Sequence, residues 1–150
     1  GGRRSADMAS LLTGIVGGVM ATIVMTIAMM ALGDDSPPPT ASLWAKYLGD
    51  AGPEAYMMQG MLLHLLYGTG AGAVFVLGGD VLGLGVGAEE LVITVVAAIV
   101  YAAVLMIIGA VFWMRVVLAM EPDRAVAMQF GLFHLMYGIV LGVSVVYLPL

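Results

Sequence analysis

The chain has only two histidines, and each lies in one of two similar segments, residues 58–72 and residues 128–142. Eight of the fifteen positions in these segments are identical, and His64 aligns with His134. In so apolar a chain Leu and Gly align easily by chance, whereas the aligned Gln, His and Tyr residues do not. Two equivalent imidazoles can hydrogen-bond neighbouring helices or act together as ligands of one metal centre.

Glycines recur on the same helical face as each histidine. Residues four positions apart lie on nearly one face of a helix. The residues on these faces are Gly60, His64, Gly68 and Gly72 in the first segment and Phe130, His134, Gly138 and Gly142 in the second. Such glycine strips leave room for a flat ligand or for the backbone of another helix. Tyr67 and Tyr137 follow the histidines by three residues, close to the same face.

The elements that carry these residues are predicted to be membrane-spanning helices. Apolar residues make up 62% of the chain and charged residues 10%, which is outside the range of soluble domains. Each of four uncharged runs exceeds the roughly 20 residues that a helix needs to cross a bilayer, and none alternates in polarity like a barrel strand. The runs are Met8–Gly33, Ala55–Gly79, Leu91–Met114 and Ala125–Leu150. The first run is too long for the apolar part of a removable signal peptide.

We therefore expect an all-α, multi-pass protein of the cell membrane with a single domain over residues 1–150. Its four transmembrane helices are expected to form an up-down bundle of two parallel two-helix repeats, at about 8–79 and 88–150. The second and fourth helices then run in the same direction, lie diagonally about 12–14 Å apart, and bring the two histidines to one depth. On the first helix a stripe of small residues predicts close packing, formed by Gly14, Gly18, Thr22 and Thr26.

The first connection is predicted to contain a short amphipathic helix that lies in the headgroup region. Three prolines at positions 37–39 begin this connection in an extended conformation. Apolar and aromatic residues then recur at helical spacing, and Trp and Tyr favour the membrane interface. These residues are Leu43, Trp44, Tyr47 and Leu48.

The histidine pair predicts an electron-transfer subunit of a larger respiratory or redox assembly, with haem b held between His64 and His134. The haem propionates are expected to face the cations of the adjoining loop, Arg115 and Arg124. Two alternatives stay open. The histidines can instead be helix-packing groups of a cofactor-free accessory or assembly subunit, or a quinone or lipid pocket can lie beside the two tyrosines.

Several other classes are disfavoured. The chain has no cysteine, so disulfides, thiolate metal sites and iron–sulfur clusters are excluded. We do not expect an enzyme, because the sequence has no catalytic triad, intramembrane carboxylate pair or His-Glu-x-x-His motif. The net charge of −5 disfavours nucleic acid, so the expected partners are the lipid bilayer and other membrane subunits. Positive charges are too evenly divided to predict the orientation.

Three sequence features resemble small four-helix membrane proteins of haloarchaea. They are the run Gly-Gly-Val-Met-Ala-Thr-Ile-Val-Met-Thr at residues 17–26, the proline-containing first connection, and the two His-Leu-x-Tyr-Gly segments. The resemblance implies a four-helix fold and a salt-adapted membrane. It implies no particular activity or cofactor, since that group has no established activity.

Overall fold

The computed structural model describes residues 2–33, 36–87 and 89–150, with side chains from Ser10 onward in the first helix. These residues form helices and no strand, which confirms the predicted all-α class. The long helices are α1 (Gly2–Leu32), α3 (Met57–Val81), α4 (Leu91–Ile108) and α5 (Arg124–Tyr147). Shorter helical elements are α2 (Pro39–Tyr47), the 3₁₀ turn η1 (Pro53–Tyr56) and the π-helix η2 (Gly109–Val117), which directly continues α4.

Four stretches of 23 to 29 residues are long and apolar enough to cross a membrane. They are Ser10–Leu32, Pro53–Val81, Leu91–Val117 and Arg124–Tyr147. A helix satisfies its own backbone hydrogen bonds, so such stretches can exist in a hydrocarbon environment that offers no water. The prediction of four helices that are long and apolar enough to span a membrane is confirmed.

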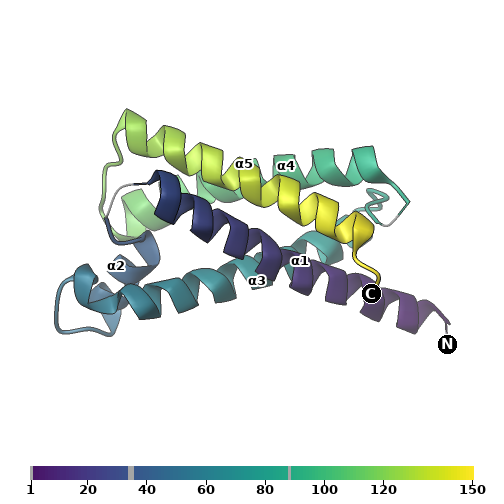
Figure 1. The fold of residues 1–150 in the computed structure, drawn as a ribbon, viewed down its shortest axis with the longest axis horizontal. Coiled ribbons are helices and arrows are strands. Elements are labelled where there is room, and N and C mark those ends of the chain that lie inside the picture. The colour runs from purple at the N-terminus through teal and green to yellow at the C-terminus, as the bar shows by residue number, and fades with distance from the viewer. Residues whose placement is uncertain (1, 34–35, 88) are drawn as a thin grey trace.

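The long helices pack in the order α3, α1, α5, α4. Helix α1 packs against both α3 and α5, and α5 packs against α4. Figure 1 shows that successive long helices run in opposite directions, with both termini at one end of the molecule. In the described residues α3 and α4 do not form a close pair. Side chains bridge them instead: the hydroxyl of Tyr101 donates to the carbonyl of Ala71 at 2.6 Å, and the Tyr101 ring packs on Phe75.

The core lies along α1 and α5. Leu141 and Ala21 are fully buried there, and Phe133 and Tyr137 are nearly so. In contrast, α4 turns a row of valines outward, at positions 92, 96, 100 and 104. In water such a row would be costly, but it suits a helix whose outer face meets lipid.

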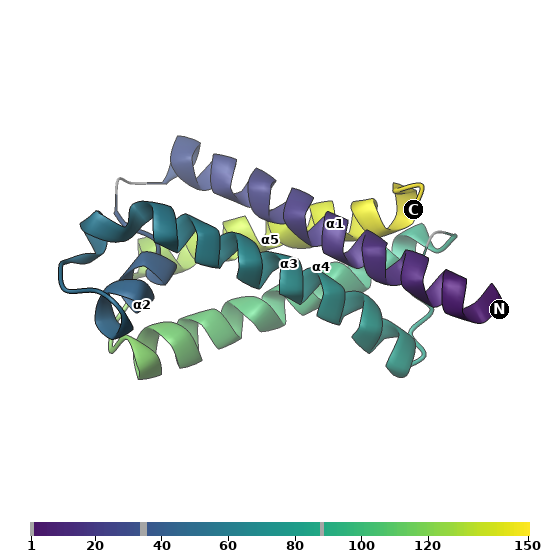
Figure 2. The same ribbon diagram turned by 90° about the horizontal axis from the view of Figure 1, so that it is seen from below.

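The predicted short helix of the first connection is present as α2 and covers the end of the bundle where α3 begins (Figure 2). Pro39 lies in its first turn, where a missing N–H has no consequence. Ala41 is fully buried against α3, while Tyr47 points outward. At the other end of α2 the ammonium group of Lys46 donates to the carbonyl of Val117 in η2. Helix α2 therefore connects α3 to η2.

The π-helix η2 is a feature that the apolar pattern does not predict. The third span was expected to stay uncharged only to Met114, whereas its helix continues through Arg115 to Val117. A π-helix has hydrogen bonds between residues five apart instead of four, is rare, and is frequent at functional sites where it does occur. Phe130 of α5 packs beside its first residue, since a Cβ atom on Gly109 would lie 2.9 Å from the Phe130 ring.

Candidate functional site around the two histidines

His64 on α3 and His134 on α5 lie at similar depth. The hydroxyl of Tyr137 donates to the carbonyl of Gly68 at 2.5 Å, which ties α5 directly to α3. Tyr137 follows His134 by three residues and Gly68 follows His64 by four, on helices that run in the same direction (Figure 1). Because each residue rises 1.5 Å along a helix, this bond places the two histidines on nearly one level.

The glycine strip of α3 is covered by α1. A Cβ atom on Gly72 would lie 2.7 Å from the Cα of Gly18, and one on Gly68 would lie 3.0 Å from the Cβ of Thr22. Real Cβ atoms essentially never lie within 3.0 Å of another non-bonded atom. A Cβ atom on Gly72 would meet the α1 backbone, and one on Gly68 would overlap the hydroxyl oxygen of Thr22, so α1 and α3 approach this closely because both positions are glycine. The small-residue stripe predicted on the first helix is confirmed as a packing face, and the α3 strip is its partner.

The glycine strip of α5 is covered by α4 in the same way. A Cβ atom on Gly138 would lie 2.9 Å from the carbonyl oxygen of Ala98, and one on Gly142 would lie 2.9 Å from the Cα of Val95. Both strips therefore bring helix backbones together. Of the two uses that a glycine strip permits, close helix packing is the one found on these faces.

The residues one turn before the histidines differ between the two segments. On α3 this residue is Gly60, whose carbonyl accepts a hydrogen bond from the Thr40 hydroxyl of α2 at 2.6 Å. A Cβ atom there would lie 2.7 Å from the backbone nitrogen of Ala41. On α5 it is Phe130, whose carbonyl oxygen is hydrogen-bonded to Nδ1 of His134 at a distance of 2.8 Å. The Phe130 ring also packs edge-on against the imidazole, with the ring centroids 4.4 Å apart.

The histidine and the tyrosine of the α5 segment make hydrogen bonds, whereas the equivalent side chains of the α3 segment make none within the described residues. The Nε2 atom of His64 is buried and makes no hydrogen bond within the described part of the chain. Tyr67 is 46% exposed, and its ring packs edge-on against Trp113 of η2 with the centroids 6.4 Å apart. Tyr137, in contrast, is 3% exposed and bonded to Gly68. Sequence reasoning did not single out Trp113, although it is the only tryptophan inside an apolar run.

The predicted cationic residues stand at the end of the molecule that α2 covers. Arg115 lies in the last turn of η2 and Arg124 begins α5, and both side chains are exposed. Near them Asp123 caps α5 by accepting a hydrogen bond from the backbone N–H of Val126 at 2.9 Å. The described residues contain no cluster of three or more His, Asp or Glu side chains that could hold a metal ion.

A haem group between the histidines has suitable donor atoms but little space. His134 is held through Nδ1, which leaves its Nε2 as the atom for a metal, and Nε2 of His64 is without a partner. However, the Tyr137 side chain crosses the interior from α5 to α3 only one turn away. The glycine strips that would lie against a planar ring are covered by α1 and α4. A haem there requires the helices to move apart.

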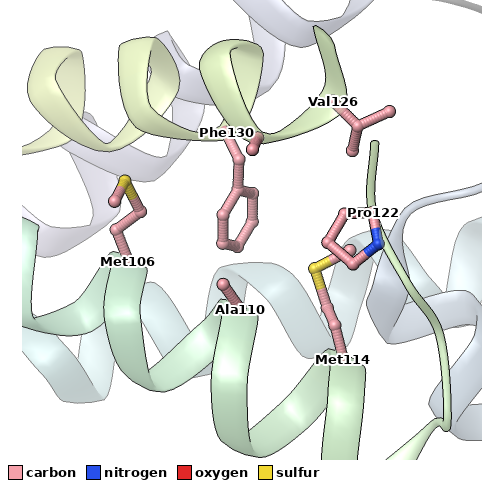
Figure 3. Close-up of a pocket in the computed structure, with 7 residues that line it drawn as sticks. Met106, Ala110, Met114, Pro122, Val126 and Phe130 are labelled. Atoms are coloured by element: carbon pink, nitrogen blue, oxygen red, sulfur yellow. The ribbon is translucent and has the colours of Figure 1, made fainter. Parts of the chain in front are cut away.

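A small pocket lies close to His134, between η2 and the beginning of α5. Figure 3 shows the Phe130 ring reaching from α5 between Met106 and Met114. The pocket has a volume of about 50 Å³ and is lined by Met106, Ala110, Met114, Pro122, Val126, Ala127 and Phe130. Sites for cofactors or drug-sized ligands measure roughly 300–1,000 Å³. This space can therefore take a group no larger than a few atoms.

Comparison with known proteins reveals no likeness. No protein-family model, no curated protein and no solved structure matches the chain.

Proposed function

We propose that this protein is a non-catalytic accessory subunit of a membrane assembly, in which the histidine segments serve helix packing. The observation that carries the proposal is that a neighbouring helix packs on each glycine strip. Helix α1 packs on Gly68 and Gly72 of α3, and α4 packs on Gly138 and Gly142 of α5. The bond from Tyr137 to Gly68 then fixes the two helix pairs to each other. An interior built in this way holds helices together and leaves little room for a large cofactor.

The contacts of the glycines also support a bundle made of two equivalent helix pairs. Gly68 of α3 faces Thr22 of α1, and its counterpart Gly138 of α5 faces Ala102 of α4. We infer that α1 with α3 and α4 with α5 are the two parallel repeats, related by an axis along the membrane normal. Both helix pairs are then built on the same kind of contact, in which one helix packs on the glycine strip of the other.

The partners of an accessory subunit with this shape are other membrane proteins. Outside the spans the described residues include α2 and the segments that join the long helices. The spans themselves hold no carboxylate pair and no charge away from their ends, which argues against ion transport. Their outer faces are apolar and suit lipid or other membrane helices.

Native gel electrophoresis can test the accessory role. The tagged protein is extracted in mild detergent from its own membranes and, for comparison, from a heterologous host. We expect a larger complex from the native membranes, because only they contain the partner subunits. Complexes of equal size from both sources would reflect self-association and would overturn the accessory role.

Haem binding is the second candidate, favoured by the free Nε2 atom of His64 and by the backbone bond that orients His134. His64 and His134 would hold the haem iron, and Arg115 and Arg124 would be the cations nearest to its carboxylates. A bound haem would supply one-electron transfer. A reduced-minus-oxidised spectrum of protein from haem-replete cells decides this. Bands of b type that vanish in both His64→Leu and His134→Leu would replace the first proposal, whereas a colourless protein removes the haem candidate.

A further inference from the structure

The two similar segments differ in the hydrogen bonds of their histidine and tyrosine side chains. Those of α5 have partners within the described chain, and those of α3 have none. On α5 the imidazole and the phenol are both bonded, His134 to Phe130 and Tyr137 to Gly68. On α3 the equivalent imidazole has a buried nitrogen without a partner, and within the described chain the hydroxyl of Tyr67 has no hydrogen bond. Packing explains the α5 groups, but it does not explain why α3 carries the same two polar side chains.

The depth of these free groups makes their lack of partners costly. The span Pro53–Val81 has 29 residues, and Tyr67 stands at its centre. Tyrosines of membrane proteins are enriched at the interfaces, where water can bond the hydroxyl. In the hydrocarbon region a hydrogen-bonding group without a partner is strongly unfavourable. A hydroxyl and an imidazole one turn apart at mid-depth therefore indicate a partner that comes from the bilayer.

Tyr67 lies on an accessible side of the bundle, and His64, whose Nε2 atom is buried, precedes it by one turn of α3. Side chains of a helix lean towards its N-terminus, so the ring of Tyr67 covers the turn that contains His64. Trp113 of η2 stands edge-on beside that ring. This is the side where α3 and α4 are bridged by side chains rather than closely packed. The 46% exposure of Tyr67 shows that a molecule in the membrane can reach it.

We propose that His64, Tyr67 and Trp113 bind the head group of a lipid-soluble quinone. A quinone ring is planar and stacks against aromatic side chains. Its carbonyl oxygens accept hydrogen bonds from a phenol, an imidazole N–H or an indole N–H, all of which this site offers. Its apolar tail remains in the bilayer. A phospholipid head group is charged and stays at the membrane surface, far from the centre of α3. The site does not depend on the accessory role or on haem.

The two tryptophans of the chain provide a direct assay. Trp44 lies in α2 and is not one of the proposed binding residues, so the variant Trp44→Phe leaves Trp113 as the only tryptophan, which can be excited at a wavelength that the tyrosines do not absorb. This variant is placed in lipid nanodiscs and titrated with decylubiquinone and, separately, with a short-chain menaquinone. Because a bound quinone lies against the indole, we expect at least one of them to quench the fluorescence in a saturable manner.

Removal of one hydrogen-bonding group then tests the site itself. In the Trp44→Phe background, Tyr67→Phe and His64→Leu should each weaken quinone binding roughly tenfold, the effect of one lost hydrogen bond. The matched control is Tyr147→Phe, since Tyr147 is 65% exposed at the far end of α5. The thermal stability of Tyr67→Phe should equal that of its parent, because this hydroxyl bonds nothing in the described part of the protein.

Two results would overturn the proposal. Quenching that grows linearly with both quinones reflects partition into the lipid and means that there is no site. Saturable quenching that Tyr67→Phe leaves unchanged places the quinone elsewhere on the protein. If His64→Leu fails to fold, Tyr67→Phe alone decides. Neither result bears on the size of the native complex, so the accessory role is judged separately.

Discussion

Among the described residues Ala119, directly after η2, is the one non-glycine residue with a positive φ, +52°. For a residue with a Cβ atom the left-handed region costs about 1–2 kcal/mol. The conformation allows the backbone N–H of Met120 to reach the carbonyl of Met114 at 2.7 Å, which closes the end of the π-helix. The strain is thus the consequence of ending η2 sharply before α5 begins.

Replacement of Ala119 by glycine should remove this strain. We expect Ala119→Gly to raise the free energy of unfolding by about 0.5–1 kcal/mol, after allowance for the greater freedom of the unfolded chain. Reversible unfolding by sodium dodecyl sulfate in mixed micelles measures the change. The control is Ala103→Gly on the exposed face of α4, which should lower stability by about 1 kcal/mol. Equal losses in both variants would contradict the assigned backbone conformation.

The hydroxyl of Tyr137 should contribute measurably to stability, because it joins α5 to α3 across the interior. Hydrogen bonds between membrane helices contribute about 0.6 kcal/mol on average and up to about 1.7. We expect Tyr137→Phe to lower the free energy of unfolding by about 1 kcal/mol in the same assay. Tyr147→Phe should have no effect, since that side chain is outside the bundle. If Tyr137→Phe leaves the free energy of unfolding unchanged, the Tyr137 hydroxyl does not link the two helix pairs.

At the scale of elements, the glycine contacts decide how closely the helices approach. Two glycines of α3 illustrate this: Gly72 faces the backbone of α1, while a Cβ atom on Gly70 would have no neighbour within 4 Å. The same residue type on the same helix therefore has two unlike roles. Only the neighbouring helix distinguishes them.

This contrast gives a matched pair of substitutions. Gly72→Ala must push α1 away and should lower the free energy of unfolding by about 1–3 kcal/mol. Gly70→Ala meets no neighbour and should raise it by up to about 1 kcal/mol, through the better helix propensity of alanine. Unfolding in mixed micelles separates the two. If both substitutions raise the free energy of unfolding, α1 does not pack on the glycine strip of α3.

At the scale of the whole molecule, the four spans fix which connections share a side of the membrane. The chain has no cysteine, so single cysteines can be labelled without background. Ala51 precedes α3, Leu84 follows it, and Met120 lies between η2 and α5, all at exposed positions. Because one span separates Ala51 from Leu84, these two must face opposite sides, and Met120 must share the side of Ala51.

Labelling of sealed, uniformly oriented vesicles with a membrane-impermeant maleimide tests this arrangement. We expect Ala51→Cys and Met120→Cys to behave alike and Leu84→Cys to behave in the opposite way. Detergent should make all three equally reactive, which serves as the control for accessibility. Labelling of Ala51→Cys and Leu84→Cys from the same side would show that α3 does not cross the membrane. The same experiment determines the orientation, which the charges leave open.

The sequence alone determined the class, the spans and the depth of the histidines. Apolar runs longer than about 20 residues must form helices in a bilayer, because the backbone finds hydrogen-bond partners only within itself. The four-residue spacing then predicted the faces of α1, α3 and α5 that carry small residues, and the repeat predicted equal levels for His64 and His134. These properties are local or periodic, so one sequence suffices to predict them.

Only the tertiary structure decided what lies against each face. A glycine strip accommodates a flat ligand and a helix equally well, and the sequence does not reveal which of them packs against it. The structure places α1 and α4 on the strips, α2 on Gly60, and Trp113 beside Tyr67. It also bonds Tyr137 and leaves Tyr67 free, although both stand in the same motif. Such differences arise from side chains that are distant in the sequence, and their positions follow from packing the whole bundle.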